Sequence, residues 1–179
     1  MPQTQNSCRA CAGEMQLVRQ DYQFKESGLD NVILKNIEVL VCKQCGGVVP
    51  RIPRLNDLTR TIVVAMIAKP SELDGAEVRF LRKFMDETIE QFARKLGINR
   101  SHLSRVENGS LAISKQTDRL VRALVLIHKP ELLEKMARLG KTEMILKQLE
   151  DIDPKPQRVR IDVASATHEY NYDLELVAA

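Results

Sequence analysis

The chain has 179 residues, a formal net charge of +3, 44% hydrophobic residues and 28% charged residues, which is the composition of a folded chain rather than a disordered one. Its longest apolar run, Ile62 to Ala68, is far shorter than the roughly 20 residues that a membrane-spanning helix needs. Tryptophan is absent and aromatic residues make up only 4%, which argues against a stacking surface for single-stranded nucleic acid.

The four cysteines form two CxxC pairs, Cys8 with Cys11 and Cys42 with Cys45. Each pair places two thiolates on one side of a tight turn, and two pairs complete the tetrahedral four-sulfur shell that Zn²⁺ prefers. A closed shell leaves no position for substrate, so we expect one structural zinc ion per chain. Iron also binds such shells, and a lone CxxC can be a redox pair. Residues 1–20 hold no apolar signal core, so we expect a cytoplasmic chain with reduced thiols.

Residues 1–54 are predicted to form a small, strand-rich domain around this metal. The segments 15–24 and 32–41 are rich in β-branched and apolar residues, and a turn is expected between them at 28–31. A short strand is expected to leave the second cysteine pair at 46–50. A domain of this size buries little apolar surface, so metal binding should contribute to its folding free energy.

A connecting helix is predicted across residues 55–70. Apolar residues recur at near-helical spacing from Leu55 to Met66, and Lys69-Pro70 ends the pattern. The β-branched run 62–64 would also suit a strand. The apolar side of this segment can pack on the zinc domain, on the domain that follows or on a second subunit.

Residues 71–150 are predicted to be successive short helices with capping signals. Asp74-x-x-Glu77 and Thr88-x-x-Gln91 are capping boxes that open two of them. A third helix is expected at 100–107, with Asn99 as its cap, and a fourth begins after Ser114 and has Leu120, Leu124 and Ile127 along one side. A fifth is expected at 131–139 after Pro130, and one further helix is expected to follow it up to Glu150.

The C-terminal segments 159–163 and 170–176 alternate between apolar and polar residues at period two. This pattern suits a hairpin or an edge added to the zinc domain's sheet, and a disordered tail is the alternative.

Two of these helices, 88–96 and 100–107, are joined by a short turn containing Gly97, which is the pattern of a helix-turn-helix. Arginine can donate two hydrogen bonds to guanine in the major groove, and the start of the second helix approaches the bases first. A solvated helix face is the alternative for these side chains. The candidate DNA-binding residues are Thr88, Arg100, Ser101, Ser104, Arg105 and Lys115.

The segments QFARKLGIN at 91–99 and LSRVENG at 103–109 resemble the Xre/Cro class of helix-turn-helix domains, over about residues 71–128. That resemblance implies that Arg100, Ser101 and Arg105 read bases. The chain departs from the class at Ile89, where members often carry a glutamine that meets a phosphate. Anchoring to the DNA backbone through Thr88, Arg94 or Lys95 is implied instead.

Two CxxC pairs followed by an Xre-type domain also resemble the organisation of MqsA (YgiT)-type antitoxins and their zinc-finger regulator relatives, over about residues 8–140. This resemblance implies a homodimer through the helical domain, an autoregulated operon and a zinc domain that covers a small RNA-cleaving toxin. The stretch 55–69 and the tail beyond residue 150 depart from that family.

The sequence therefore predicts an α+β chain with a four-cysteine zinc domain at 1–54, a connecting helix at 55–70, an all-α, lambda-repressor-like domain at 71–150 and a tail at 151–179. The three histidines are scattered, and no phosphate-binding loop or nucleophile motif is present, so an enzyme is not expected. We expect a dimeric repressor on a palindromic, double-stranded operator with half-sites about 34 Å apart or a multiple of that. The alternative is an antitoxin whose zinc domain binds a toxin.

Overall fold

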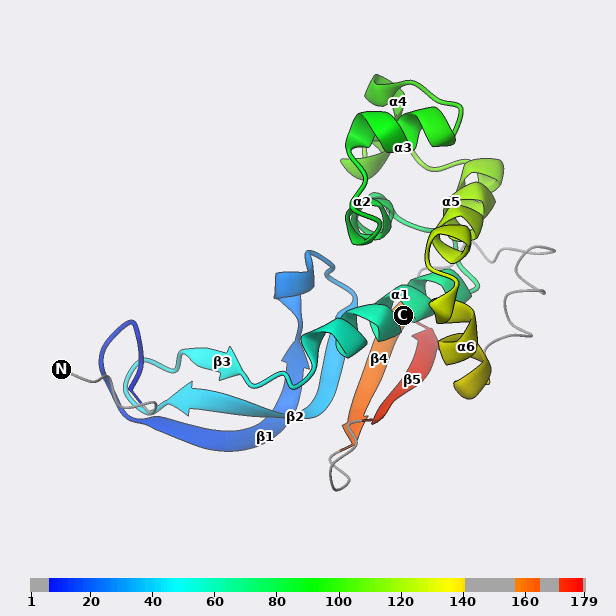
Figure 1. The fold of residues 1–179 in the computed structure, drawn as a ribbon. Helices are drawn as coiled ribbons and strands as arrows, with labels where there is room; N and C mark the ends of the chain where they lie inside the picture. Colours follow the sequence, from blue (N-terminus) through cyan, green and yellow to red (C-terminus); the bar gives the residue numbers. More distant parts are fainter. Residues whose placement is uncertain (1–6, 141–156, 165–170, 179) are drawn as a thin grey trace.

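A computed structural model describes residues 7–140, 157–164 and 171–178, and it confirms the α+β class (Figure 1). The strands are β1 (Met15–Gln23), β2 (Val32–Cys42), β3 (Val48–Pro50), β4 (Gln157–Ala164) and β5 (Asn171–Ala178). The helices are η1 (Lys25–Ser27), α1 (Leu55–Ala68), α2 (Gly75–Phe84), α3 (Ile89–Lys95), α4 (Arg100–Glu107), α5 (Lys115–His128) and α6 (Glu131–Arg138). Within these residues, no helix is long and apolar enough to cross a membrane.

The sheet is organised around β2, which pairs with β1 in antiparallel register from Met15 opposite Cys42 to Gln23 opposite Ile33. The other side of β2 pairs with β3 near the cysteines and, in parallel, with β4 near its start. β4 and β5 form an antiparallel hairpin. The C-terminal segments therefore form both a hairpin and an added edge of the N-terminal sheet, which joins two of the predicted alternatives.

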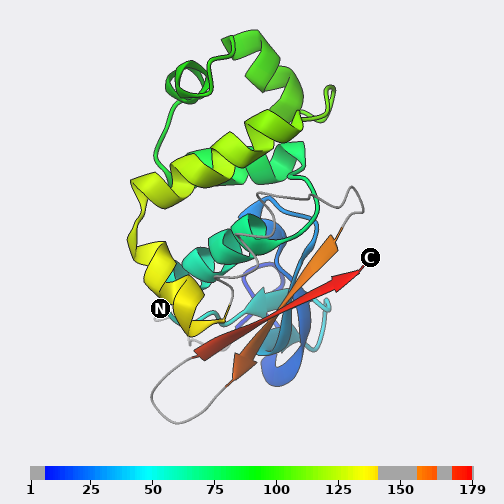
Figure 2. The ribbon, with the colours of Figure 1, turned by 90° about the vertical axis from the view of Figure 1, so that its right-hand side faces the viewer.

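Helix α1 lies between the sheet and the helical bundle (Figures 1 and 2). Every residue from Thr61 to Ala68 has 0% of its surface exposed. A helix that is apolar all round is stable only when neighbours cover all its sides. Here α1 shares one continuous core with sheet residues such as Leu34 and with bundle residues such as Phe92 and Leu132. The apolar side predicted for this segment packs on both neighbours.

The C-terminal end of α1 is capped by a buried arginine from α5. Arg122 donates hydrogen bonds to the carbonyl oxygens of Ile67, Lys69 and Ser71 at 2.6–2.8 Å. Its charge is balanced by Asp118, whose Oδ2 lies 2.8 Å from the arginine Nε. These bonds satisfy carbonyl groups that a helix end otherwise leaves without partners. No local pattern in the sequence indicates this role of Arg122.

Three parts of the fold meet at Glu77, which is fully buried. Its carboxylate accepts hydrogen bonds from Lys69 Nζ (2.5 Å) after α1, from Asn31 Nδ2 (2.8 Å) before β2, and from the Asp74 backbone N–H (2.8 Å). The last bond completes the predicted capping box of α2, together with the Glu77 N–H donating to Asp74 Oδ1. We call this cluster of Asn31, Lys69 and Glu77 the junction, because it ties the sheet to the bundle.

The remaining helices begin where the capping signals predicted. The Thr88 capping box is formed in full, and Asn99 and Ser114 each accept a backbone N–H in the first turn of the helix that follows. The further helix expected up to Glu150 lies outside the described residues. The domain boundaries proposed from sequence stay a prediction, because a single core runs through the sheet, α1 and the bundle.

Candidate metal centre and nucleic-acid interface

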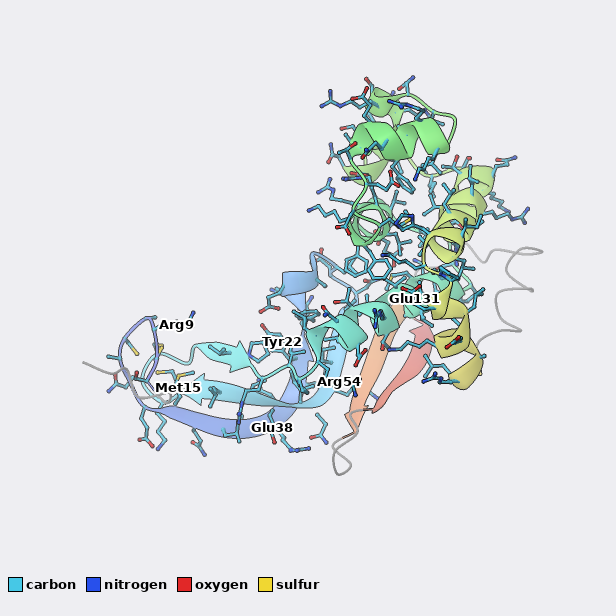
Figure 3. All side chains as sticks on the ribbon, in the orientation of Figure 1. Arg9, Met15, Tyr22, Glu38, Arg54 and Glu131 are labelled. Carbon is cyan, nitrogen blue, oxygen red and sulfur yellow. The ribbon has the colours of Figure 1, made fainter. Side chains whose placement is uncertain are left out.

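The two cysteine pairs come together at the end of the sheet farthest from α1, where sulfur atoms gather beside Arg9 and Met15 (Figure 3). All four Sγ atoms lie within 4.8 Å of one another, with Cys8 to Cys45 at 3.6 Å and Cys11 to Cys42 at 3.4 Å. A tetrahedral zinc ion with Zn–S bonds of about 2.3 Å needs sulfur–sulfur separations of about 3.8 Å. The donor set and its spacing therefore fit zinc.

Both cysteine turns have the same backbone construction. The Cys8 N–H donates to the Gly13 carbonyl and the Cys42 N–H to the Gly47 carbonyl. The residue four after each first cysteine closes the turn in the left-handed region, and this residue is Ala12 (φ 58°) in one turn and Gly46 (φ 68°) in the other. A glycine adopts this conformation without strain, whereas alanine does so at a cost.

The four thiols influence one another's ionisation. Backbone N–H groups of Cys45 and Gln44 point at Cys42 and lower the pKa of that thiol to about 6. The backbone N–H of Gly13 acts in the same direction on Cys11, but the neighbouring Cys42 and Cys45 sulfurs outweigh it and raise the Cys11 pKa to about 12. Four thiolates this close repel one another unless a metal ion offsets their charge.

Helices α3 and α4 form the two helices of the predicted motif, with Gly97 in the left-handed conformation between them (φ 68°). Phe92 and Ala93 of α3 and Leu103 and Val106 of α4 are buried. The end of α4 is fixed by α2, where Arg82 forms two hydrogen bonds to the Glu107 carboxylate at 2.6 and 2.8 Å. These bonds also raise the pKa of Arg82.

Comparison of the sequence with protein families gives a match in this part of the chain. Residues 85–117 match a family model described as Helix-turn-helix, HTH_3. The chain therefore carries an Xre/Cro-type DNA-binding motif. No curated protein matches the chain. The matched region runs from the end of α2 through α3 and α4 to the start of α5 and includes all six candidate DNA-binding residues.

Within that motif, the outward side of α4 carries Arg100, Ser101 and Arg105, all exposed, and Ser104, half-buried. Arg100 and Arg105 form no ion pair or side-chain hydrogen bond with any described residue, in contrast to Arg82. Lys115, the first residue of α5, is likewise exposed and unpaired among the described residues. Thr88 is exposed at the start of α3, where its hydroxyl accepts the Gln91 N–H.

Ile89, the position that departs from the Xre/Cro class, is partly buried and packs against the core. It therefore contributes to packing and has no group to offer a phosphate. Lys95, one of the alternatives expected for backbone anchoring, is paired with Glu87, whereas Arg94 is exposed.

Proposed function

We propose that this protein is a sequence-specific transcriptional repressor that binds DNA as a dimer. The observation that carries the proposal is the unpaired, exposed side of α4 within a helix-turn-helix: Arg100, Ser101 and Arg105. Arginines that stabilise the fold, such as Arg82, are bound to a carboxylate. An arginine held on a short helix without a partner is ready to donate both its terminal N–H groups to guanine.

In this proposal α4 enters the major groove and Arg105 reads a guanine. Arg100 and Ser101 approach the bases at the start of the helix, with Ser104 beside them. Thr88 and Lys115 lie at the starts of the flanking helices α3 and α5. The free backbone N–H groups at these helix starts, and the charge of Lys115, favour binding of DNA phosphates. A two-fold dimer then reads a palindromic operator, and binding of the protein upstream of its own gene would make it autoregulatory.

The zinc ion in this proposal is structural. Cys8, Cys11, Cys42 and Cys45 would hold it and leave no coordination position for a substrate. Its chemistry is to neutralise the thiolates and to fix the two turns relative to each other, which orders the far end of β1, β2 and β3.

Selection of bound sequences from a random double-stranded DNA pool tests the proposal, followed by competition with non-specific DNA. We expect a palindromic site, and we expect Arg105→Ala to lose about 1–3 kcal/mol on that site and to relax preference at one base pair per half-site. Arg138→Ala, at an exposed arginine of α6 paired with Glu134, is the control. Equal loss by Arg105→Ala on selected and random DNA would refute base reading.

A second candidate function is that of an antitoxin, as in the MqsA-type family. One observation favours it: an apolar row crosses one face of the sheet near the cysteines, with Leu17 opposite Leu40 and Leu40 opposite Val49. Leu17 and Val49 are 46% and 50% exposed, which is the kind of surface that a protein partner covers.

Co-expression with the product of the adjacent gene tests this candidate. We expect a stable complex and rescue of growth if that product is a toxin, and we expect Leu17→Glu to abolish both without changing DNA binding. Failure to co-purify, with no toxicity of the neighbour alone, would leave the repressor function by itself.

A further inference from the structure

Positively charged side chains gather where the start of α1 meets α6. Arg54 precedes α1 and Arg60 lies within it, whereas Lys135 and Arg138 belong to α6. The Lys135 Nζ donates a hydrogen bond of 3.0 Å to the Asp57 carbonyl oxygen in the first turn of α1, so the two helices are in direct contact. We call the four residues Arg54, Arg60, Lys135 and Arg138 the basic cluster.

The carboxylates paired with the basic cluster offset only part of its charge. Asp57, whose side chain is 24% exposed, pairs with Arg54 at 2.5 Å and with Arg60 at 3.7 Å. Arg138 pairs with Glu134 at 3.7 Å, and both of these side chains are strongly exposed. Four cations against these two carboxylates leave a surplus of two positive charges.

The surplus of charge acts on Lys135, which is half-buried rather than fully solvated. Burial lowers the pKa of this ammonium; the Asp57 carboxylate opposes the shift, and the three arginines of the basic cluster add to it. Glu131, one turn earlier on α6, lies apart from Arg54 (Figure 3) and forms no ion pair with a described residue. An anion bound beside Lys135 would therefore relieve a repulsion that is present in the fold.

We propose that the basic cluster binds the phosphate group of a small molecule, either inorganic phosphate or a phosphomonoester. Three of its four members are arginines, whose planar guanidinium groups can each donate two parallel hydrogen bonds to phosphate oxygens. The guanidinium groups of Arg54 and Arg60 already converge on one carboxylate, that of Asp57. A phosphate group carries about 1.5–2 negative charges at neutral pH, which matches the surplus of two positive charges.

The position of the basic cluster favours a small molecule over the phosphates of DNA. Helix α6 and the start of α1 lie at the end of the helical part that is away from α4 (Figures 1 and 2). DNA bound to α4 would contact the opposite end of the molecule. The proposal therefore goes beyond the proposed function, because it uses none of the DNA-binding residues.

Isothermal titration calorimetry of the zinc-loaded full chain tests the proposal, with inorganic phosphate and ribose 5-phosphate as probes at fixed ionic strength. We expect saturable binding of one phosphate group per chain with a dissociation constant below about 1 mM, and no binding of ribose itself. Equal affinity for the two probes would identify free phosphate as the ligand, whereas tighter binding of ribose 5-phosphate would identify an ester.

Arg60→Gln is the variant that tests the assignment to the basic cluster. The Arg60 side chain is 46% exposed, so its replacement leaves no buried group without a partner, and we expect at least about tenfold weaker binding of both probes. Arg19→Gln is the matched control, because Arg19 is an arginine of similar exposure, 42%, that pairs with Glu38 on the sheet. Circular dichroism would show that both variants fold.

Absence of saturable phosphate binding, or equal affinity in Arg60→Gln and the wild-type chain, would overturn the proposal. Loss of phosphate binding in Arg105→Ala, with binding intact in Arg60→Gln, would also overturn it, because the phosphate would then bind at α4. The first two results leave the proposed DNA-binding function standing. A chain that binds phosphate at the basic cluster without binding a specific DNA site would refute that function and support this proposal.

Discussion

The junction allows a quantitative test of what joins the sheet to the DNA-binding helices. Replacing Glu77 with leucine leaves the Lys69 ammonium, 4% exposed, without its counter-charge. It also removes the acceptor for the Asn31 amide and for the Asp74 backbone N–H. Breaking one partner of a buried ion pair costs about 3–5 kcal/mol, which is a large part of the total stability of about 5–15 kcal/mol for a typical domain.

The double variant Glu77→Leu with Lys69→Met should lose much less free energy of unfolding than the sum of the losses of the two single variants. Removing both charges eliminates the uncompensated ion, so the remaining cost comes from the two donors left without an acceptor, about 1–3 kcal/mol each when buried. Since Asn31 is only partly buried, water can replace part of its bond. We therefore expect the double variant to lose about 1–3 kcal/mol in all, with a coupling between the two sites of several kcal/mol.

Urea unfolding of the zinc-loaded protein, followed by far-ultraviolet circular dichroism, measures these free energies. The matched control is Lys43 with Glu14, an ion pair of 2.8 Å on the sheet surface whose side chains are 49% and 69% exposed. Its double-mutant cycle should give a coupling of less than about 1 kcal/mol. Additive losses for Glu77 and Lys69, or a coupling no larger than that of the control, would refute the role assigned to the junction.

The remaining predictions concern pH, backbone strain and metal. Burial raises the pKa of Glu77, although the nearby Lys69 charge acts in the opposite direction. The stability that this raised pKa contributes is therefore fully present below the unfolded pKa of about 4.3 and is lost as pH rises through the folded pKa. Glu77→Gln should remove this fall in the free energy of unfolding with rising pH, measured by urea titrations at several pH values. Ala12→Gly should stabilise the metal-bound chain by about 1 kcal/mol, and Gly46→Ala should destabilise it by as much or more, in thermal unfolding. Chelation, or Cys42→Ser, should disorder the cysteine end of the sheet and leave the helical circular dichroism intact; loss of the helical signal would contradict this.

Local signals in the sequence were sufficient for the helix boundaries. The capping boxes at Asp74 and Thr88 involve residues three apart, so their bonds depend on nothing outside the first turn. The CxxC spacing has the same property, because each turn is closed by its own backbone bonds. The two cysteine turns and the helix-turn-helix could therefore be predicted before any tertiary contact was known.

Features that depend on distant partners could not be predicted in the same way. The sequence predicts Glu77 only as the last residue of a capping box. No neighbouring residue in the chain indicates that the distant Asn31 donates a hydrogen bond to its carboxylate. Asp118 and Arg122 are spaced for a surface ion pair on a helix, yet both are buried, and Arg122 bonds to carbonyl groups at the C-terminal end of α1. The period-two pattern of the tail fits a strand but does not name its neighbour, so the pairing of β4 with β2 came only from the structure.

Periodicity also does not tell which side of a helix faces the core. On α5 the row Leu120, Leu124 and Ile127 is more apolar than the row containing Asp118 and Arg122, yet the latter is buried. The reason is that Arg122 caps α1 and Asp118 neutralises it, so this polar pair is satisfied inside the fold. A buried ion pair that is fully hydrogen-bonded can thus leave an aliphatic row outside, and such a row is where a partner is expected.

The same contacts determine which parts of the molecule move together. An added Cβ on Gly75 would lie 2.1 Å from the Val106 carbonyl oxygen, so the start of α2 is packed directly on the end of α4. Two residues further along α2, Glu77 is bonded to the sheet and to the end of α1. Helix α4 is therefore fixed to the sheet through α2, whereas the four cysteines lie at the opposite end of that sheet. It follows that a change at the four cysteines should leave α4 in place, whereas loss of the junction should displace it.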